Sequence, residues 1–478
     1  MTSMPHRLLR GRRAGLAALL TGLVLALPDA ASAHGIGGAS DLPIPGWLFA
    51  WGATAVLILS FVALGVLWPK PRLESMGSRP ALTLPRFAEP AAAIAGLATG
   101  ALVVVSALFG TTDTATNLAP TFVWVAFWVA VPLATVVLGD FYTALDPWRT
   151  IARLAGAASR ALGRSPRAVS PYPAKLGRWP AAAGLAIIGW MELVWLRRDD
   201  PRALGLVILA YGAIQLAGMA RYGIVAWRRN ADPFAVYTHV LSHASPVVVE
   251  GRRVSLRAPL SGLPSLVAAS GTAAVMVVLI GTTSFDGLSR GTLWAKIGPQ
   301  LGTLGGDLGL STPTANQVTG TIGLALALAL VAGVYRIGVN GMQRLVRVGH
   351  QRDAMAGHFA HTLVPIAVAY VVAHYFSLVA LQGQALVSLA SDPLGDGANI
   401  FGTASASVNY TLLSAGTIWA VQVIALVSGH VGGLVLAHDR ALTLYAKARD
   451  ATRSQYWMLA IMVGFTTLAL WLLAQAGT

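Results

Sequence analysis

The chain has 478 residues, of which 55% are hydrophobic and 11% are charged, against about 25% charged residues in ordinary soluble domains. So little charge excludes a soluble protein of this length and predicts a polytopic membrane protein. The sequence contains no cysteine, which excludes disulfides, Fe–S clusters and cysteine nucleophiles. We attribute the net charge of +15 to cytoplasmic loops and not to nucleic-acid binding, because such loops collect Lys and Arg.

Residues 1–33 have the three parts of a cleavable signal peptide. Arginines precede an apolar run at 14–27, which is too short to span a bilayer, and Ala31-Ser32-Ala33 forms a small-residue cleavage site. Cleavage there makes His34 the mature N-terminus. Its amine and imidazole could together chelate Cu(II), and a plain exposed histidine is the alternative.

Apolar runs of membrane-spanning length then recur along the chain. They predict an all-α bundle of ten transmembrane helices, formed by residues 34–478 as one transmembrane domain without a soluble domain. The predicted spans are 46–68, 89–110, 120–139, 179–196, 202–222, 264–282, 318–339, 356–380, 412–437 and 456–475.

Charge distribution orients these spans. If residue 34 lies outside the cell, the loops 69–88, 140–178, 223–263, 340–355 and 438–455 lie inside and, with the adjoining helix ends, hold most of the 34 Lys and Arg residues. The outside segments hold Arg197, Arg198, Arg202, Arg290 and Lys296. This asymmetry satisfies the positive-inside rule. It predicts a multi-pass protein of a bacterial plasma membrane with both mature ends outside.

Two predicted inner loops share an Asp-Pro-aromatic motif, at Asp146-Pro147-Trp148 and Asp232-Pro233-Phe234. Asp before Pro is a favourable start of a helix, with Asp as N-cap and Pro in the first helical position. We therefore predict helix caps here in preference to catalytic carboxylates. The segments that follow are expected to be amphipathic helices at the inner surface.

Ionisable residues within the predicted spans are candidates for function, because such groups are costly in a bilayer. His361 and His430 fall at a similar distance from the inner ends of the eighth and ninth spans, so we expect these spans to be neighbours. One interpretation is a metal site at the inner leaflet, for which imidazoles suit Zn or Cu. Its ligands are drawn from His239, His243, His358, His361 and His430, with Asp439 or Asp232 as carboxylate partner.

Three alternatives to that site remain open. The histidines could instead form hydrogen bonds between helices, or His361 and His430 could ligate a haem. The chemistry could also belong to the outer face, where the set would be His34, Glu192 and His374. Pro132 and Pro365 are expected to kink their spans; such kinks occur beside transporter substrate sites but are also tolerated by packing alone.

Several strings of the sequence resemble a known family. They are His34-Gly35-Ile36-Gly37-Gly38, Leu42-Pro43-Ile44-Pro45, Asp146-Pro147-Trp148-Arg149, Leu363-Val364-Pro365-Ile366-Ala367, Ala373-His374-Tyr375-Phe376, and Gly429-His430 through Ala437-His438-Asp439-Arg440. The pattern is similar to bacterial polytopic membrane proteins named fenitrothion-hydrolase-like. The resemblance implies hydrolysis of organophosphate triesters. The family pattern favours Asn where Asp146 stands, so it implies no role for a carboxylate there.

Two functions follow as hypotheses. The first is a membrane-embedded, metal-assisted hydrolase of apolar phosphotriesters, in which metal-bound water would be the nucleophile. The second is a transporter or permease for a metal ion or small solute, with the histidines as transient ligands or proton carriers. The expected partners are the lipid bilayer and a small apolar substrate or ion, and the oligomeric state is left open.

Overall fold

The computed structural model describes residues 46–164, 168–267, 269–345, 352–445 and 447–476; the predicted signal peptide and His34 lie outside these ranges. The fold is mostly helical, at 72%. Within the described ranges, seven helices are long and apolar enough to cross a membrane: Ala88–Phe109, Leu118–Leu138, Pro201–Tyr222, Thr272–Ser289, Thr312–Arg344, Met355–Gln382 and Ala415–Leu444. By length and composition, these are the helices of a multi-pass membrane protein, as the sequence predicted.

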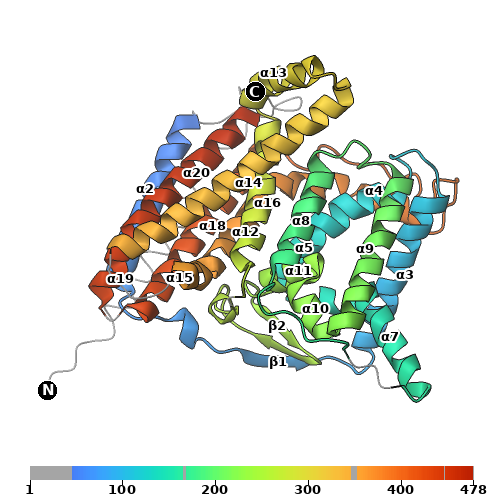
Figure 1. The fold of residues 1–478 in the computed structure, drawn as a ribbon, viewed down its shortest axis with the longest axis horizontal. Coiled ribbons are helices and arrows are strands. Elements are labelled where there is room, and N and C mark those ends of the chain that lie inside the picture. The colour runs from blue at the N-terminus through green and yellow to red at the C-terminus, as the bar shows by residue number, and fades with distance from the viewer. Residues whose placement is uncertain (1–45, 165–167, 268, 346–351, 446, 477–478) are drawn as a thin grey trace.

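The helices form two groups with a pair between them (Figure 1). On one side lie α2 (Gly46–Leu67), α14 (Thr312–Leu345), α18 (Ala415–Leu444) and α20 (Tyr456–Ala476). On the other lie α3 (Ala88–Phe109), α4 (Leu118–Thr121), α5 (Val131–Leu138), α8 (Trp179–Leu193) and α9 (Pro201–Tyr222). Between them stand α12 (Thr272–Ser289) and α16 (Val364–Gln382). The helix α12 starts at Thr272 and not at the predicted 264, because Gly271, at φ +83°, ends the preceding loop.

The predicted eighth and ninth spans are neighbours, as expected. Gly429 of α18 packs on the backbone carbonyl of Pro365 and the side chain of Ala369 in α16. A side chain at Gly429 would overlap both atoms, so the glycine permits the close approach of the two helices. Shorter helices complete this region: α15 (Arg352–Phe359), α17 (Ala385–Ser391) and α19 (Ala448–Ser454).

Two spans are interrupted next to the prolines at which kinks were expected. A π-helical stretch, η3 (Phe122–Ala130), joins α4 to α5, and Pro132 follows it. A 3₁₀ turn, η5 (Ala360–Leu363), joins α15 to α16, and Pro365 follows it. Such departures from α-helical geometry are often found at functional sites, and the first of them positions Trp128, which is discussed below.

One order of elements occurs twice in succession. The first unit is α3, α4–η3–α5, α6 (Tyr142–Leu145) and α7 (Pro147–Ala161); the second is α8, α9, α10 (Ile224–Asn230) and α11 (Pro233–Ser242). The last helix of each unit begins at the Asp-Pro motif. Asp146 accepts hydrogen bonds from the backbone of Trp148 and Arg149, and Asp232 accepts one from that of Ala235. The two predicted N-caps are therefore confirmed.

The helices that follow the caps differ in burial. The helix α7 is amphipathic and largely exposed, as predicted. In contrast, α11 is buried along nearly its whole length, so the expectation of a surface helix was wrong for this segment. The reason is its apolar sequence, which packs between α5 and α8; Pro233 lies against Gly184 of α8.

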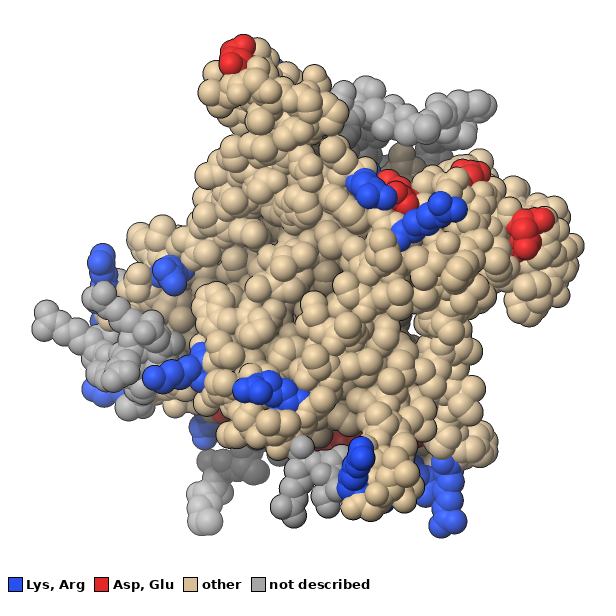
Figure 2. Space-filling view, turned by 45° about the vertical axis from the view of Figure 1, so that its right-hand side comes forward, with Lys and Arg blue, Asp and Glu red and all other residues tan. Residues whose placement is uncertain are grey.

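A small antiparallel sheet, which the sequence did not predict, closes one end of the bundle (Figure 1). Its strands are β1 (Arg79–Thr83), β2 (Val247–Glu250) and β3 (Arg253–Leu256), in the order β1-β3-β2. We call this the sheet end. The opposite end carries α13 (Thr292–Asp307), which folds back on α14, and we call it the α13 end. Basic side chains gather at the sheet end, below a broad uncharged band (Figure 2).

Candidate functional site

Four ionisable or hydroxyl side chains from three helices meet towards the α13 end. We call Glu192 of α8, Asp286 of α12, and His374 and Tyr375 of α16 the acid–histidine cluster. His374 Nε2 lies 2.6 Å from Asp286 Oδ2. The Tyr375 hydroxyl lies close to the carboxylates of Glu192 and Asp286, which approach from different helices.

The carboxylates of Asp286 and Glu192 have different hydrogen-bond partners. Asp286 is 4% exposed and is bonded by the Arg290 guanidinium at 3.0 Å as well as by His374, so a cation offsets its charge. Glu192 accepts a hydrogen bond of 2.6 Å from Trp128 Nε1, which is a neutral donor, while Arg198 bonds its backbone carbonyl. The side chain of Glu192 is therefore the acid in this cluster that lacks a directly bonded cation among the described residues.

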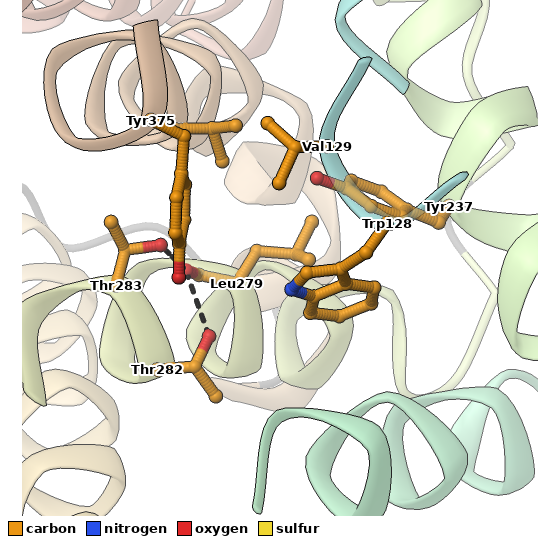
Figure 3. Close-up of a pocket in the computed structure, with 8 residues that line it drawn as sticks. Trp128, Val129, Tyr237, Leu279, Thr282, Thr283 and Tyr375 are labelled. Carbon is orange, nitrogen blue, oxygen red and sulfur yellow. Dashed lines mark hydrogen bonds between the residues drawn. The ribbon is translucent and has the colours of Figure 1, made fainter. Parts of the chain in front are cut away.

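A small cavity borders the cluster at Tyr375 (Figure 3). Its lining comes from η3, α11, α12 and α16: Trp128, Val129, Tyr237, Leu279, Thr282, Thr283, Val371 and Tyr375. The volume is about 10 Å³, close to the space that one water molecule needs. Both Trp128, which donates to Glu192, and Tyr375, which lies close to both acids, border the cavity. Movement of these two rings would therefore open the cavity towards the carboxylates.

The structure brings together two of the three residues predicted for the outer face. Glu192 and His374 belong to one cluster, and His34 lies outside the described residues. Asp286 was missed by the sequence analysis, because the predicted span ended at 282 and left this aspartate in a loop. The sequence signal that could have placed it is the helical spacing between Asp286 and Arg290, which form an i,i+4 pair.

The histidines predicted near the inner leaflet lie in separate places. The His239 and His243 rings are in edge-to-face contact, with centroids 4.8 Å apart, as their spacing on one helix predicted. His361 and His430 are buried, at 4% and 0% exposure, and within the described ranges the Nε2 atom of each has no hydrogen-bond partner. His430 Nδ1 bonds the carbonyl of Leu426. His358 is partly buried on α15.

Asp439 holds a loop in place. Its carboxylate accepts hydrogen bonds from Trp68 Nε1 at 2.8 Å and from the backbone of Arg72 and Leu73 at 2.6 and 3.2 Å. Both oxygens are therefore occupied by donors from the segment that follows α2.

The unpaired Nε2 atoms of His361 and His430 are chemically able to bind a metal ion. However, in the part of the chain that the structure describes, no three His, Asp or Glu residues are grouped to hold a metal.

The geometry supports binding and proton exchange rather than a preformed metal centre. The acid–histidine cluster offers one charge-compensated carboxylate, one carboxylate with neutral donors, and a tyrosine between them. Such a group can bind a small cation or pass a proton. Comparison with known proteins adds no assignment, since no protein-family model, no curated protein and no solved structure matches the chain.

Proposed function

We propose that the protein is a transporter of a small inorganic cation and that the acid–histidine cluster is its binding site. The observation that carries this proposal is the contact between Asp286 and His374, with Glu192 near enough to feel the charge of Asp286, beside a small cavity. Ionisable groups are rare within membrane bundles and usually mark the path of an ion or a proton. A cation bound at Glu192 would offset the carboxylate that has neutral donors.

The interrupted helices support the same function. Transporter binding sites are commonly built from discontinuous helices, whose breaks expose backbone groups and allow parts of the bundle to move. Here the π-helical stretch η3 carries Trp128, and the buried helix α11 carries Tyr237; both side chains line the cavity. The cavity is closed on the scale of one water molecule, which is the form expected of an occluded state between two open ones.

We further propose that all ten predicted ranges span the membrane and that the chain has no soluble domain. Helices α2, α8 and α20 occupy the three predicted ranges beyond the seven long apolar helices. With ten spans in a bacterial plasma membrane, the basic sheet end would face the cytoplasm and the α13 end the outside. This topology can be tested with a reporter that is active only in the cytoplasm, fused after Thr478. Activity of this reporter would contradict the topology.

Transport can be measured in proteoliposomes under an imposed potential, with H⁺, Na⁺ and Zn²⁺ as probes and trapped indicator dyes as readout. We expect at least one probe to cross faster than in protein-free vesicles. Glu192→Gln should reduce that flux on the order of tenfold, because the neutral amide cannot offset the charge of a cation.

The matched control is Glu89→Gln, since Glu89 is 45% exposed in a surface pair with Arg149 and Arg153. Flux equal to empty vesicles for all three probes, or flux unchanged by Glu192→Gln, would overturn the proposal.

Hydrolysis of an apolar phosphotriester is the second candidate, supported by the resemblance to fenitrothion-hydrolase-like proteins. The His374–Asp286 pair favours it, because a carboxylate that orients an imidazole is the arrangement of a general base. A cavity of about 10 Å³ has no room for such a substrate, since pockets for organic ligands measure about 300 Å³ or more. This candidate therefore requires opening of the site. Release of nitrophenolate from a dialkyl nitrophenyl phosphate by purified protein, lost in Asp286→Asn, would support it.

A further inference from the structure

A second buried group of charges lies towards the sheet end, at the two Asp-Pro motifs. We call Asp140, Asp146, Arg228 and Asp232 the Asp–Pro cluster. Asp146 and Asp232 are both 0% exposed, and each caps the last helix of one of the two successive units described above. Asp146 lies close enough for its negative charge to act on Asp232. Two acids of like charge thus lie together inside the bundle.

Arg228 neutralises one of these acids. Its Nε atom donates to Asp146 Oδ2 at 2.8 Å, and its Nη2 atom donates to Thr143 Oγ1 at 3.1 Å. Asp146 Oδ1 accepts from the backbone of α7. Both oxygens of Asp146 are therefore hydrogen-bonded and one is bonded to a cation, which is the arrangement that stabilises a buried carboxylate in its charged form.

In contrast to Asp146, only one oxygen of Asp232 is hydrogen-bonded to a described residue. Its Oδ1 atom accepts from the Tyr211 hydroxyl at 2.7 Å and from the backbone of Ala235 at 3.1 Å. Its Oδ2 atom is buried and has no hydrogen-bond partner among the described residues. A buried carboxylate oxygen without a partner is costly when charged, whereas a protonated oxygen carries no charge.

Four titratable groups act on Asp232. They are Tyr211 from α9, Arg228 from α10, Tyr142 from α6, and Asp146 at the start of α7. Burial and then the charge of Asp146 raise the pKa of Asp232 to about 6, against the lowering by the Tyr211 and Ala235 hydrogen bonds and by Arg228. Arg228 is thus shared by two acids while it is bonded to one.

The cluster is connected to the surface at the sheet end. Thr143, which Arg228 contacts, donates to Asp140 Oδ2 at 2.9 Å, and the same oxygen lies 3.8 Å from His239 Nδ1. The Asp140 and His239 side chains are 24% and 29% exposed. A series of polar side chains therefore runs from the partly exposed Asp140 and His239 to Asp146, beside Asp232.

We propose that Oδ2 of Asp232 is a proton-binding site, filled from the sheet end, and that its proton accompanies the cation through the bundle. A proton from water forms an O–H bond with the Asp232 carboxylate, and the group becomes neutral. Coupling to a cation rests on the proposed transport function, whereas proton binding itself does not. The helix α11 connects the two sites, because it begins at Asp232 and carries Tyr237, which lines the cavity beside Trp128.

Infrared spectroscopy of the full chain in lipid can test proton binding without transport, because a protonated carboxyl has a band distinct from that of a carboxylate. We expect the protonated-carboxyl band of the wild type to grow as the pH falls from about 8 to about 5, and Asp232→Asn to lose the contribution of one carboxyl. The matched control is Asp200→Asn. Asp200 caps α9 in the same Asp-Pro arrangement, accepting from Ala203, but it is 34% exposed and paired with Arg197. Its removal should leave the band unchanged.

A second variant keeps the test decisive if Asp232→Asn does not fold. Tyr211→Phe removes one donor to the charged form of Asp232, so the band should titrate at a higher pH than in the wild type. An unmoved midpoint in Tyr211→Phe, or a band that persists in Asp232→Asn, would overturn the proposal. A midpoint that falls when Na⁺ replaces choline, and falls equally in Glu192→Gln, would also overturn it, in favour of Na⁺ competing with the proton at this oxygen. Without Na⁺, Glu192→Gln should keep the contribution that Asp232→Asn loses, so proton binding and transport can fail separately.

Discussion

His374 and Asp286 are joined by a contact of 2.6 Å between Nε2 and Oδ2, although 88 positions separate them in the chain. The contact connects α16, in the middle of the bundle, to the end of α12. It also sets the orientation of the imidazole, because the ring nitrogen that faces the carboxylate is fixed and the other is left for further bonding. The neighbouring Tyr375 extends this pair to Glu192.

We expect His374→Ala to lower cation flux on the order of tenfold or more, because Asp286 then loses one of its two side-chain partners. The comparison is with Arg290→Gln, which removes the other partner. Arg290 is 65% exposed, so water replaces it readily and the loss should be smaller. Flux through both variants in proteoliposomes is the measurement. An equal effect of the two substitutions would show that the imidazole acts only as a counter-charge.

Asp439→Asn should reduce stability by roughly 1–3 kcal/mol, because a buried acceptor of three hydrogen bonds is weakened. The thermal midpoint of detergent-solubilised protein reports this change, and flux for each folded molecule should be retained. Asp199→Asn is the control, since Asp199 is 54% exposed in a surface pair with Arg198 and should have little effect. Loss of bound metal in Asp439→Asn without loss of stability would instead identify Asp439 as a ligand.

The metal predicted from the sequence can be tested on the two orphaned imidazoles. If His361 and His430 are ligands, purified protein contains a transition metal such as Zn or Cu, and His361→Ala and His430→Ala each remove it. Membrane insertion should survive, because Ala is more apolar than His in a span. Elemental analysis of the three proteins is the measurement. Wild-type protein free of metal after purification without chelators would contradict the prediction.

Gly96→Ala should impair folding, whereas Gly100→Ala should be tolerated. An added Cβ at Gly96 would lie 1.7 Å from the backbone oxygen of Leu145, and one at Gly100 would lie 3.5 Å from the ring of Pro147. The first distance is an overlap with backbone that only a shift of α6 can relieve, and the second is an ordinary contact. The yield of monodisperse protein after detergent extraction distinguishes the two variants; equal yields would mean that α6 can move away from α3.

Acidification should destabilise the protein in part through His243. Burial and then the neighbouring His239 lower the pKa of His243 from 6.5 to about 4, so the folded protein favours the neutral ring. Stability from this residue is present above pH 6.5 and is lost as the pH falls to about 4, on the order of 1–3 kcal/mol in total. His243→Gln should flatten the dependence of the thermal midpoint on pH in that window. An unchanged slope would contradict the assignment.

The local features of this fold were predictable from the sequence. The runs of apolar residues predicted the long helices. Backbone N–H and C=O groups inside a membrane must be hydrogen-bonded within the chain, and a helix of about 20 residues achieves this across the bilayer. The Asp-Pro motifs at Asp146 and Asp232 gave the caps, since capping depends on residues a few positions apart.

What escaped prediction depends on contacts distant in sequence. The sheet pairs Leu82 with Val254, and neither short strand has a pattern that indicates its partner. Asp286 was placed outside its helix because the apolar run fades before it, although the helix continues to Ser289. The bonds of Asp286 to His374 and of Asp146 to Arg228 arise from packing, which no spacing along the chain encodes.

The three-stranded sheet has a mechanical consequence. Strand β1 belongs to the connection between α2 and α3, whereas β2 and β3 belong to the connection between α11 and α12. Pairing of β1 with β3, and the hydrogen bond that the Leu84 backbone N–H donates to the Arg252 carbonyl, therefore bridge segments from both groups of helices. At the other end, α8, α12 and α16 are joined through side chains that can exchange their partners for water. The sheet therefore ties the two groups of helices together at its own end, and in the proposed transport cycle the two groups would separate most at the α13 end.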